Sequence, residues 1–327
     1  MILTQTPLRI SLGGGGTDLP SYYREYGGFV ISAAIDKYVY IGVHRSFAPG
    51  YLLKYSESEY APTREQIRHR LIREALTFLD VEPQVEIVSL ADVPAGTGLG
   101  SSGSFLVGLL HALYTWQGKT PTRETIAAEA AVIEIERLND SIGKQDQYIA
   151  AYGGLLCQEY APDGKVHLTP LQMTAAAVAE LQNSLMLFFV GQTRSASSLL
   201  DDQKTKSEQQ DPKMLDDLHF TRQLGLEIKQ VLEQGEVARF GKLMHEHWLR
   251  KRDRSAGITN PLIDQAYAQA LHSGGAIGGK LVGAGGGGFL LLQTQDRPRL
   301  ATAMEEIGMK EMEFRFDFKG SIVKLRD

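Results

Sequence analysis

The stretch DVPAGTGLGSSGS, residues 92–104, decides which fold the sequence predicts. It follows a strand-like run, VEIVSL at residues 85–90, and opens a segment at residues 102–117 that is apolar on nearly all sides, as in a buried helix. Glycines and hydroxyl side chains at a helix start present backbone N–H groups to an anion, and the helix dipole adds to the attraction. The stretch therefore predicts a phosphate-binding loop. The alternative is a flexible turn with a serine cap, which would need neither four glycines nor paired serines.

Two nucleotide-binding loops of other folds fit this stretch poorly. Gly98, Gly100 and Gly103 match the dinucleotide pattern G-x-G-x-x-G, yet they lie near residue 100 and not at the first strand of a nucleotide lobe. About 20 residues further on, where that pattern needs an acid at the end of a second strand, Arg123 and Glu124 follow a proline-marked break. A Walker A loop is excluded because the G-K-[ST] ending is missing. An NAD-dependent oxidoreductase is kept as a distant alternative to the interpretation as a phosphate-binding loop of another kind.

Length and composition predict a two-lobed cytoplasmic protein. The 327 residues exceed a single compact core, so a cleft between two lobes is expected, and we place the domain boundary near residue 180, giving domains 1–180 and 181–327. A net charge of −5 offers no field for nucleic acid or an anionic membrane. The single cysteine, the lack of an export signal and the lack of a long apolar run all favour the cytoplasm, with no membrane partner.

Hydrophobic periodicity predicts several further elements. The strands are expected at residues 33–44 and 185–192, with a hairpin around residues 160–168. An amphipathic helix is expected over residues 64–79, and another begins with Thr120 as cap and Pro121 at its first position and runs to about Arg137.

Two charged segments are predicted to lie at the surface. Residues 201–213 (DDQKTKSEQQDPK) are predicted to form a mobile surface loop, with a lid over the cleft as the alternative. Residues 246–254 (EHWLRKRDR) are predicted to be the solvated face of a helix. His245 and His247 point apart on such a helix, so no zinc site is expected.

Three more segments carry candidate chemistry. Residues 7–23 (PLRISLGGGGTDLPSYY) place Arg9 on a probable strand and Asp18 directly after four glycines and a threonine, where a carboxylate suits hydroxyl recognition or, alternatively, a helix cap. Residues 280–292 form a glycine loop between two strand-like runs. In residues 134–154, Glu134 with Ser102 suits magnesium, which prefers oxygen ligands and substrate phosphates. Asp146 is expected to accept the proton of a substrate hydroxyl or to hold that hydroxyl in line.

Taken in order, PLRISLGGGGTD, PAGTGLGSSGS, GKQDQY and KLVGAGGGG resemble the motifs of the GHMP kinase superfamily and span almost the whole chain. The resemblance implies an α+β fold of two lobes, an N-terminal nucleotide-binding α/β lobe and a ferredoxin-like C-terminal lobe. It also implies ATP in the cleft between the lobes, with Mg²⁺ as the metal ion.

The resemblance assigns roles by position. Asp146 takes the catalytic position and Arg9 the basic position near the reacting hydroxyl. Asp18, with Thr17, takes the position that binds sugar hydroxyls. Ser102 and Glu134 would hold the magnesium ion. The ATP phosphates would be bound by Pro94, Gly96, Gly98, Leu99, Gly100, Ser101, Ser102 and Gly103, and Gly285 and Gly286 would border the substrate. Gly15 and Gly16 replace side chains of the G-E-H form, which argues against galactose specificity.

Within the family, LGGGGTDLPSYY and SIGKQDQYIAAYGG are most similar to the branch that phosphorylates the anomeric hydroxyl of D-glycero-D-manno-heptose 7-phosphate. A phosphorylated acceptor needs cationic partners, and the candidates are Arg24, Lys37 and Arg194. The alternatives are a fucokinase or galactokinase-like enzyme and a non-catalytic sugar sensor, which the presence of Asp146, Ser102 and Glu134 disfavours.

Overall fold

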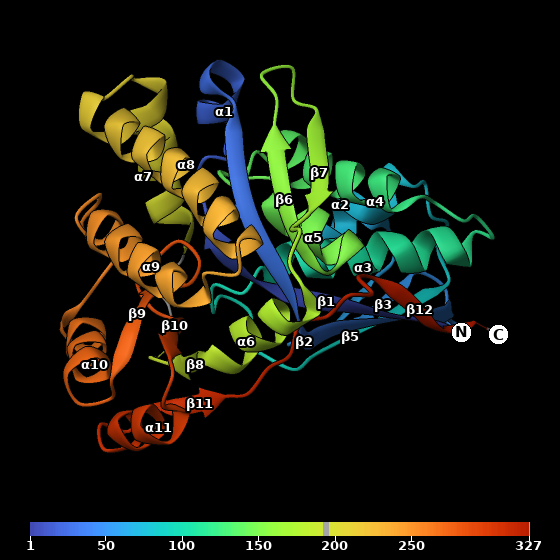
Figure 1. Ribbon diagram of the computed structural model, residues 1–327. Helices are drawn as coiled ribbons and strands as arrows, with labels where there is room; N and C mark the ends of the chain where they lie inside the picture. Colours follow the sequence, from blue (N-terminus) through green and yellow to red (C-terminus); the bar gives the residue numbers. More distant parts are fainter. Residues whose placement is uncertain (192–195, 327) are drawn as a thin grey trace.

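The computed structural model describes residues 1–191 and 196–326, without the side chains of residues 196 and 197. Its strands form two sheets, one of eight strands and one of four, and helices cover both (Figure 1). The first sheet draws its strands from residues 2–170 and 322–326, and the second from residues 185–312. The predicted α+β class and the two-lobed architecture are confirmed.

The larger sheet is built around one long strand, β2, which pairs with different partners along its length. Residues 28–33 of β2 pair with β6, and residues 39–45 pair with β5. The path through the sheet is β12-β1-β2-β5-β3-β4, with β7 attached to β6, and only β3 and β5 run parallel. Its strands are β1 (Ile2–Gly13), β2 (Gly28–Arg45), β3 (Tyr51–Lys54), β4 (Ser58–Ala61), β5 (Val85–Ala91), β6 (Leu155–Tyr160), β7 (Val166–Pro170) and β12 (Ile322–Arg326).

The smaller sheet has the strand order of a ferredoxin-like lobe. Its antiparallel order is β11-β8-β10-β9, so the first strand in sequence is central and the second lies at an edge. Helices separate the first strand from the second and the third from the fourth. The strands are β8 (Leu185–Phe189), β9 (Ala276–Leu281), β10 (Phe289–Thr294) and β11 (Lys310–Met312).

A layer of helices joins the two sheets. Helix α8 packs on β1 and β2, α9 packs on β9 and β10, and the two helices contact each other (Figure 1). The helices are α1 (Pro20–Tyr26), α2 (Arg70–Phe78), α3 (Ser101–Trp116), α4 (Arg123–Ala131), α5 (Gln145–Tyr152), α6 (Ala175–Ser184), α7 (Ala196–Glu208), α8 (Pro212–Glu233), α9 (Val237–Arg252), α10 (Pro261–His272) and α11 (Arg297–Glu305). A 3-10 turn, η1 (Arg64–Gln66), precedes α2, and a π-helix, η2 (Val132–Arg137), continues α4.

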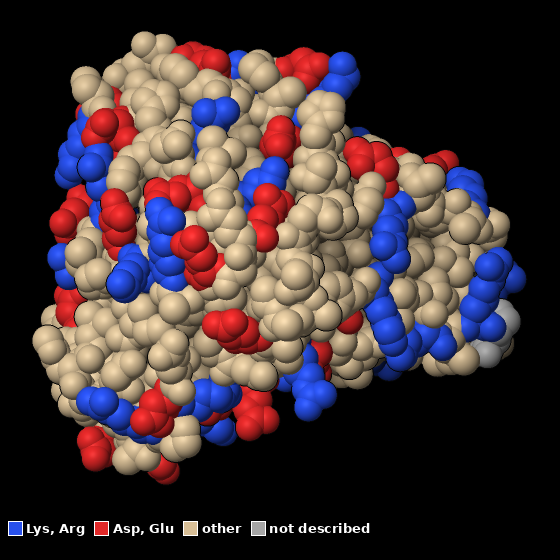
Figure 2. All heavy atoms as spheres, viewed as in Figure 1, with Lys and Arg blue, Asp and Glu red and all other residues tan. Residues whose placement is uncertain are grey.

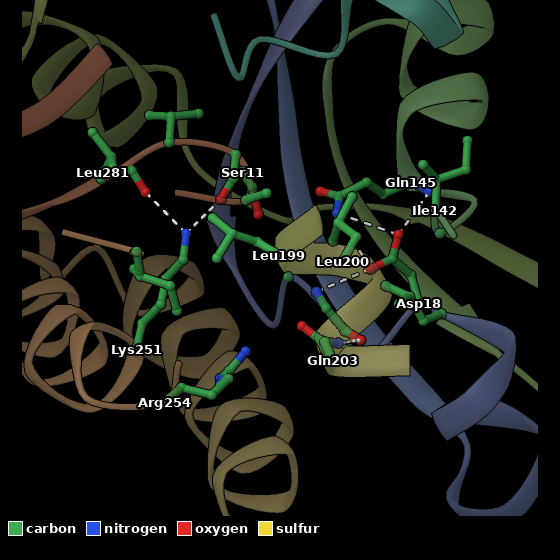
Figure 3. Close-up of a pocket in the computed structure, with 18 of the residues that line it drawn as sticks. Ser11, Asp18, Ile142, Gln145, Leu199, Leu200, Gln203, Lys251, Arg254 and Leu281 are labelled. Atoms are coloured by element: carbon green, nitrogen blue, oxygen red, sulfur yellow. Dashed lines mark hydrogen bonds between the residues drawn. The ribbon is translucent and has the colours of Figure 1, made fainter. Parts of the chain in front are cut away.

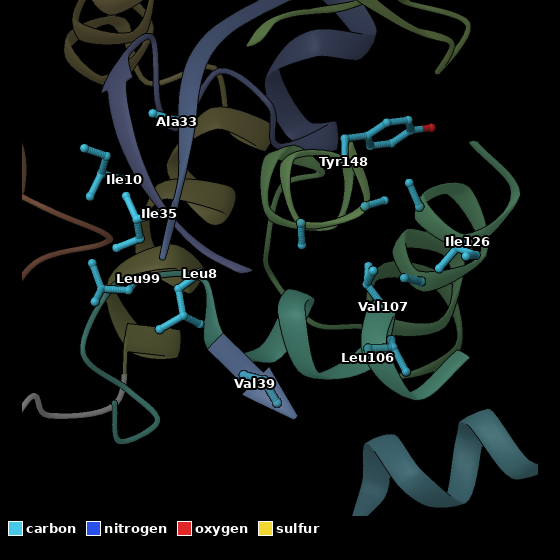
Figure 4. Packing of buried hydrophobic residues seen from close by; sticks show 14 of the residues in the cluster. Leu8, Ile10, Ala33, Ile35, Val39, Leu99, Leu106, Val107, Ile126 and Tyr148 are labelled. Carbon is cyan, nitrogen blue, oxygen red and sulfur yellow. The ribbon is translucent and has the colours of Figure 1, made fainter. Parts of the chain in front are cut away.

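The apolar helix α3 lies at the centre of the first lobe. It packs on β1 and β2 and is covered by α2, α4 and α5, which explains why its sequence is apolar on nearly all sides. Leu106 and Val107 of α3 lie among buried side chains of β1 and β2, including Leu8 and Val39 (Figure 4). The prediction of a buried helix here is confirmed.

Three predicted elements differ from the structure. The helix expected at residues 64–79 begins only at Arg70, after η1, and His69 accepts a hydrogen bond at its start. The helix expected from Thr120 begins at Arg123, because the Thr122 hydroxyl caps it by accepting from the Thr125 N–H at 3.0 Å. The mobile loop expected at residues 201–213 is wrong: residues up to 208 belong to α7, and α8 begins at Pro212.

Acidic and basic side chains are intermixed over α7, α8 and α9 on the face that Figure 2 shows. Ion pairs account for part of this mixture, including Arg250 with Asp217 at 2.6 Å and Arg239 with Glu227 at 2.7 Å. None of the helices in the described part of the chain combines the length and apolar character needed to cross a membrane.

Candidate active site

The loop between β5 and α3 adopts the backbone that a phosphate cradle requires. Gly96, Gly98 and Gly100 have positive φ angles of 79°, 82° and 75°, which side chains other than glycine rarely adopt. Gly100 caps α3, whose first residue is Ser101. The N–H groups at this helix start are therefore presented to the loop, as anion binding needs.

The two glycine loops of the chain pack against each other. A Cβ added at Gly98 would lie 2.5 Å from the Val282 carbonyl oxygen, and a Cβ at Gly288 would overlap the carbonyl oxygen of Thr97. Gly98 and Gly288 therefore allow close contact between backbones as well as any approach by a ligand. Gly286 donates its N–H to the Ile258 carbonyl at 2.8 Å, and neither Gly285 nor Gly286 lines the cavity described below; Gly283 and Ala284 do.

Arg9 and Asp146 form a two-point ion pair beside the phosphate loop. Arg9 Nε lies 2.7 Å from Asp146 Oδ1, and Arg9 Nη2 lies 2.9 Å from Oδ2. Arg9 also donates to the carbonyl of Gly98 and stands on β1, while Asp146 stands in the first turn of α5. A Cβ at Gly103 would lie 2.7 Å from the Asp146 Cβ, so this glycine allows α3 to approach α5. The pair fixes the orientation of the carboxylate.

Asp18 is a second carboxylate in the same cavity, and it is fully buried. It accepts hydrogen bonds from the Gly16 N–H at 3.0 Å and the Gln145 N–H at 3.1 Å. Burial raises the pKa of Asp18, and these N–H groups oppose the rise. Thr17, in contrast, uses its hydroxyl within the turn, donating to Gly14 O and Phe29 O at 2.8 and 2.9 Å and accepting from the Phe29 N–H. Its hydroxyl is therefore occupied by backbone.

Ser102 and Glu134 both line a second cavity, which Arg70 and Asp140 also line. Glu134 lies in η2 and is 1% exposed, and it accepts hydrogen bonds from Gln147 Nε2 at 2.5 Å and from the Ser102 hydroxyl. Burial is the main cause that raises its pKa to about 7, so a nearby cation would be favourable. A carboxylate and a hydroxyl oxygen are ligands that suit Mg²⁺, which in kinases takes its other ligands from water and substrate phosphates.

The main cavity lies between elements of both lobes. Figure 3 shows Asp18 and Gln145 on one side, Lys251 and Arg254 on the other, and Gln203 of α7 between them. Gln203 donates to the carbonyl of Gly16 at 2.9 Å and so ties α7 to the first glycine motif. Ser11, Gln145 and Gln203 were missed by sequence reasoning, because single Ser and Gln residues carry no pattern. The Ser11 hydroxyl is buried and has no hydrogen-bond partner among the described residues.

The residues predicted to bind the phosphate of the acceptor are not found at this cavity. Arg24 lies on α1 at a different cavity, together with Lys204 and Glu208. Lys37 lies on β2, where its ammonium is 3.6 Å from Asp36, and it does not line the main cavity. Arg194 lies outside the described residues.

The predicted solvated face at residues 246–254 is wrong for three of its members. His247 is 3% exposed, Arg254 is 7% exposed, and both line the main cavity with Lys251. Their spacing of four and three residues puts them on one side of α9 and the turn that follows it, beside the buried Trp248. Sorting the charged run by helical face groups these three residues but does not show what they face.

Comparison with known proteins agrees with this geometry. The model of the GHMP kinases N terminal domain matches residues 67–154, and that of GHMP kinases C terminal matches residues 228–308. The chain is 29% identical to a D-glycero-alpha-D-manno-heptose 7-phosphate kinase of Campylobacter jejuni, over 88% of each chain. It is 26% identical to an L-fucokinase/L-fucose-1-P guanylyltransferase of Bacteroides fragilis, over 93% of this chain and 35% of that protein.

Solved structures show the same similarity. A D-glycero-D-manno-heptose 1-phosphate kinase from Bacteroides thetaiotaomicron superimposes over all of both chains, with a TM-score of 0.82 and 25% identity. The galactokinase of Lactococcus lactis, solved with galactose, gives a TM-score of 0.77 at 15% identity and so shares the fold. The dinucleotide alternative is wrong, because the strand that follows the loop and α3 in sequence, β6, pairs antiparallel with β2 and β7 and forms no parallel βαβ unit with β5. Since the two family models together match more than half of the chain, this chain belongs to the GHMP kinase family.

Proposed function

We propose that this kinase transfers the γ-phosphoryl group of ATP to the anomeric hydroxyl of D-glycero-D-manno-heptose 7-phosphate, giving the 1,7-bisphosphate and ADP. The observation that carries the proposal is the Arg9–Asp146 pair, which lies between the phosphate loop and a cavity that also holds Asp18. The heptose assignment is supported by the similar kinases from Campylobacter jejuni and Bacteroides thetaiotaomicron, whose names both contain a heptose phosphate.

Asp146 is the group that handles the proton of the acceptor. Both of its oxygens accept from Arg9, and each retains a lone pair for a further hydrogen bond. The acceptor hydroxyl donates to this carboxylate, its oxygen forms a bond to the γ-phosphorus, and the bond from that phosphorus to the leaving ADP oxygen breaks. The proton passes to Asp146 and then to solvent. Asp18 and Ser11 would hold further hydroxyls of the sugar.

Ser102 and Glu134 would hold Mg²⁺ together with the phosphates of ATP. The ion neutralises charge on the phosphates. The protein's own part is to bury Glu134 and to hold its carboxylate through Gln147, so that one charged oxygen is directed at the start of α3.

The test is ADP release measured by a coupled assay with a panel of acceptors. We expect turnover with D-glycero-D-manno-heptose 7-phosphate, in magnesium, at a kcat/KM at least tenfold above that for free heptose, mannose, fucose and galactose. The position of the new phosphate is read by ³¹P and ¹³C NMR of the product. Turnover unaffected by EDTA would contradict the role of magnesium.

An L-fucose 1-kinase is the second candidate, because the chain also resembles the fucokinases of Bacteroides fragilis and Arabidopsis thaliana over more than nine-tenths of its length. The same panel separates the two candidates. Equal or better use of fucose would reject the heptose assignment and leave a GHMP kinase with another acceptor.

A further inference from the structure

We propose that His247, Lys251, Arg254 and Lys280 form a binding site for a phosphate group that the acceptor already carries. This inference rests on the proposed function, since it names how the same cavity recognises a phosphorylated sugar. It replaces the candidates that the sequence suggested, because neither Arg24 nor Lys37 lines this cavity.

The four side chains reach one wall of the main cavity from two packed elements. Helix α9 and the turn after it contribute His247, Lys251 and Arg254, and the neighbouring strand β9 contributes Lys280. Figure 3 shows Lys251 and Arg254 on the opposite side of the cavity from Asp18 and Gln145. A sugar between these walls would meet a carboxylate on one side and a group of cations on the other.

Three of the four side chains have nitrogen atoms without a partner among the described residues, whereas the fourth, Lys251, donates to the carbonyls of Leu281 and Gly283. Lys280 is 3% exposed, and its ammonium makes no hydrogen bond or ion pair with any described residue. Both ring nitrogens of His247 lack a hydrogen-bond partner in the described part of the chain. The Nε of Arg254 lacks one there as well. Arg254 uses one other nitrogen, Nη2, which donates to the Thr221 hydroxyl at 2.7 Å. Native proteins rarely leave such groups unpaired, so a ligand is the natural partner.

The nearby carboxylates do not neutralise this wall. Asp146 is paired with Arg9, Asp217 is paired with Arg250 at 2.6 Å, and Asp18 accepts from N–H groups of its own lobe. Burial, together with repulsion between the cations, lowers the pKa values of Lys251 and Lys280. A phosphate dianion would satisfy the free donors and offset this repulsion.

Two sources could supply such a phosphate: the acceptor, or the group in transfer from ATP. The phosphate loop is close to this wall, since Gly98 packs on Gly283 and Lys251 donates to the Gly283 carbonyl. We assign the site to the acceptor's own phosphate because His247 and Arg254 extend it along α9, beyond the residues that contact the loop.

The experiment compares Lys280→Met with the parent protein on two acceptors, heptose 7-phosphate and unphosphorylated heptose. Lys242→Met is the control, because Lys242 is an exposed lysine on helix α9, which packs on the strand β9 that carries Lys280. We expect Lys280→Met to lower kcat/KM for the phosphorylated acceptor by roughly 10²-fold, the loss of a charge-assisted contact. The kcat/KM for free heptose and the KM for ATP should change by no more than about threefold.

Folding does not obscure the result. Because Lys280 is buried and unpaired, its replacement by Met should raise the thermal midpoint of the empty protein, while Lys242→Met should leave it unchanged. A second measurement, independent of turnover, uses inorganic phosphate as the ligand. Phosphate should raise the thermal midpoint of the parent protein and raise that of Lys280→Met much less. Equal stabilisation of both would overturn the site.

The outcomes separate this inference from the proposed function. If the parent uses heptose 7-phosphate and Lys280→Met uses it equally well, the site is wrong and the function stands. If Lys280→Met loses both acceptors equally and raises the KM for ATP, the cations serve the transferred phosphate and the inference fails. If the parent releases no ADP with heptose 7-phosphate, the proposed function fails. Thermal stabilisation by inorganic phosphate then becomes the test of whether the site binds phosphate.

Discussion

The role proposed for Asp146 needs a carboxylate in a fixed orientation, and Arg9 supplies the contacts that fix it. Two hydrogen bonds at 2.7 and 2.9 Å hold it, and Gly100 and Gly103 leave room for the pair between β1, α3 and α5. An amide at this position would keep the shape but lose the charge and the ability to take a proton. Asp146→Asn therefore tests the chemical role of the carboxylate while keeping the size of the side chain.

We expect Asp146→Asn to lower kcat by roughly 10²- to 10⁴-fold while leaving ATP binding unchanged, the usual span for a general base. Stopped assays of ADP release give kcat, and equilibrium binding of ATP gives the second quantity. Asp163→Asn, in the exposed turn between β6 and β7, is the control and should match the parent. Turnover by Asp146→Asn within twofold of the parent would remove Asp146 from its assigned role.

We expect Lys251 to make acceptor binding depend on pH. Burial is the main cause that lowers its pKa to about 7 in the empty cavity, and repulsion by Arg254 and Arg9 adds to this. At pH 8 the amine is mostly neutral, and a bound phosphate dianion raises its pKa again. Binding should therefore take up protons at pH 8 and fewer at pH 6, where the ammonium already exists.

The measurement is calorimetric titration with heptose 7-phosphate in two buffers of different ionisation enthalpy. The other groups that face Lys251 are the basic side chains His247, Lys280, Arg254 and Arg9 and the carboxylic side chains Asp18 and Asp146. His247 and Lys280 also have lowered pKa values, so they add to the uptake in the same direction. We expect Lys251→Met to reduce the uptake at pH 8 and Lys242→Met to leave it unchanged. Proton release at pH 8 would contradict this account.

Among the elements, α3 and α5 contact each other at Gly103, where α5 leaves no room for a side chain. A Cβ at Gly103 would lie 2.7 Å from the Asp146 Cβ and 3.2 Å from the Gln147 backbone nitrogen. Helix propensity alone would favour alanine at this position by up to about 1 kcal/mol. The clash opposes that gain, since overpacking costs about 1–3 kcal/mol and the relaxation must move Asp146.

Gly103→Ala should therefore lower kcat by roughly 10²-fold, because a displacement of about 1 Å at a reacting group has that effect. Its thermal midpoint should fall or stay unchanged. Gly118→Ala is the control: it strains a positive φ of 74° but meets no atom within 4 Å, so it should cost stability and leave kcat unchanged. A Gly103→Ala variant with parental kcat would show that α5 does not depend on this contact.

Elements with a strong local signal could be predicted, and those defined by packing could not. The buried helix α3, the long strand β2 and the β6–β7 hairpin follow from apolar periodicity and turn residues. The polar composition of residues 201–213 predicts a loop, yet residues 201–208 belong to α7, and Gln203 and Ser207 are buried. The charged run in α9 was interpreted as a surface because composition does not say which helical face meets the cavity.

For the whole molecule, the motifs located the carboxylates but not the wall that faces them. Arg9, Asp18 and Asp146 follow from glycine-rich motifs of the first lobe, and the structure brings these three together. Lys251, Arg254 and Lys280 come from the second lobe, and their position depends on how α8 and α9 join the two sheets. Long-range packing of this kind leaves no pattern in a single sequence.

The same packing makes the first lobe dependent on the second. Strand β12, from the end of the chain, pairs with β1, and the Ser321 hydroxyl lies 2.8 Å from that of Thr6. Helix α8 closes the other side of the sheet: a Cβ at Gly13 would lie 3.0 Å from Ile228 Cδ1, and one at Gly225 would lie 3.1 Å from Phe29. Ile228 is buried in the same core cluster as Phe29, so a boundary at residue 180 would cut through one hydrophobic core.

We therefore expect a fragment of residues 1–180 not to fold alone, because it would expose the apolar surface of β1 and β2 that α8 covers and an unpaired edge at β1. Circular dichroism during heating should show no cooperative transition for the fragment and a single one for the whole chain. Co-expression with residues 181–327 is the matched control and should restore both the transition and ADP release, since the missing strand and helices are then supplied. A fragment of residues 1–180 that unfolds cooperatively within a few degrees of the whole chain would show instead that the first lobe is an independent domain and that the helix layer only docks on it.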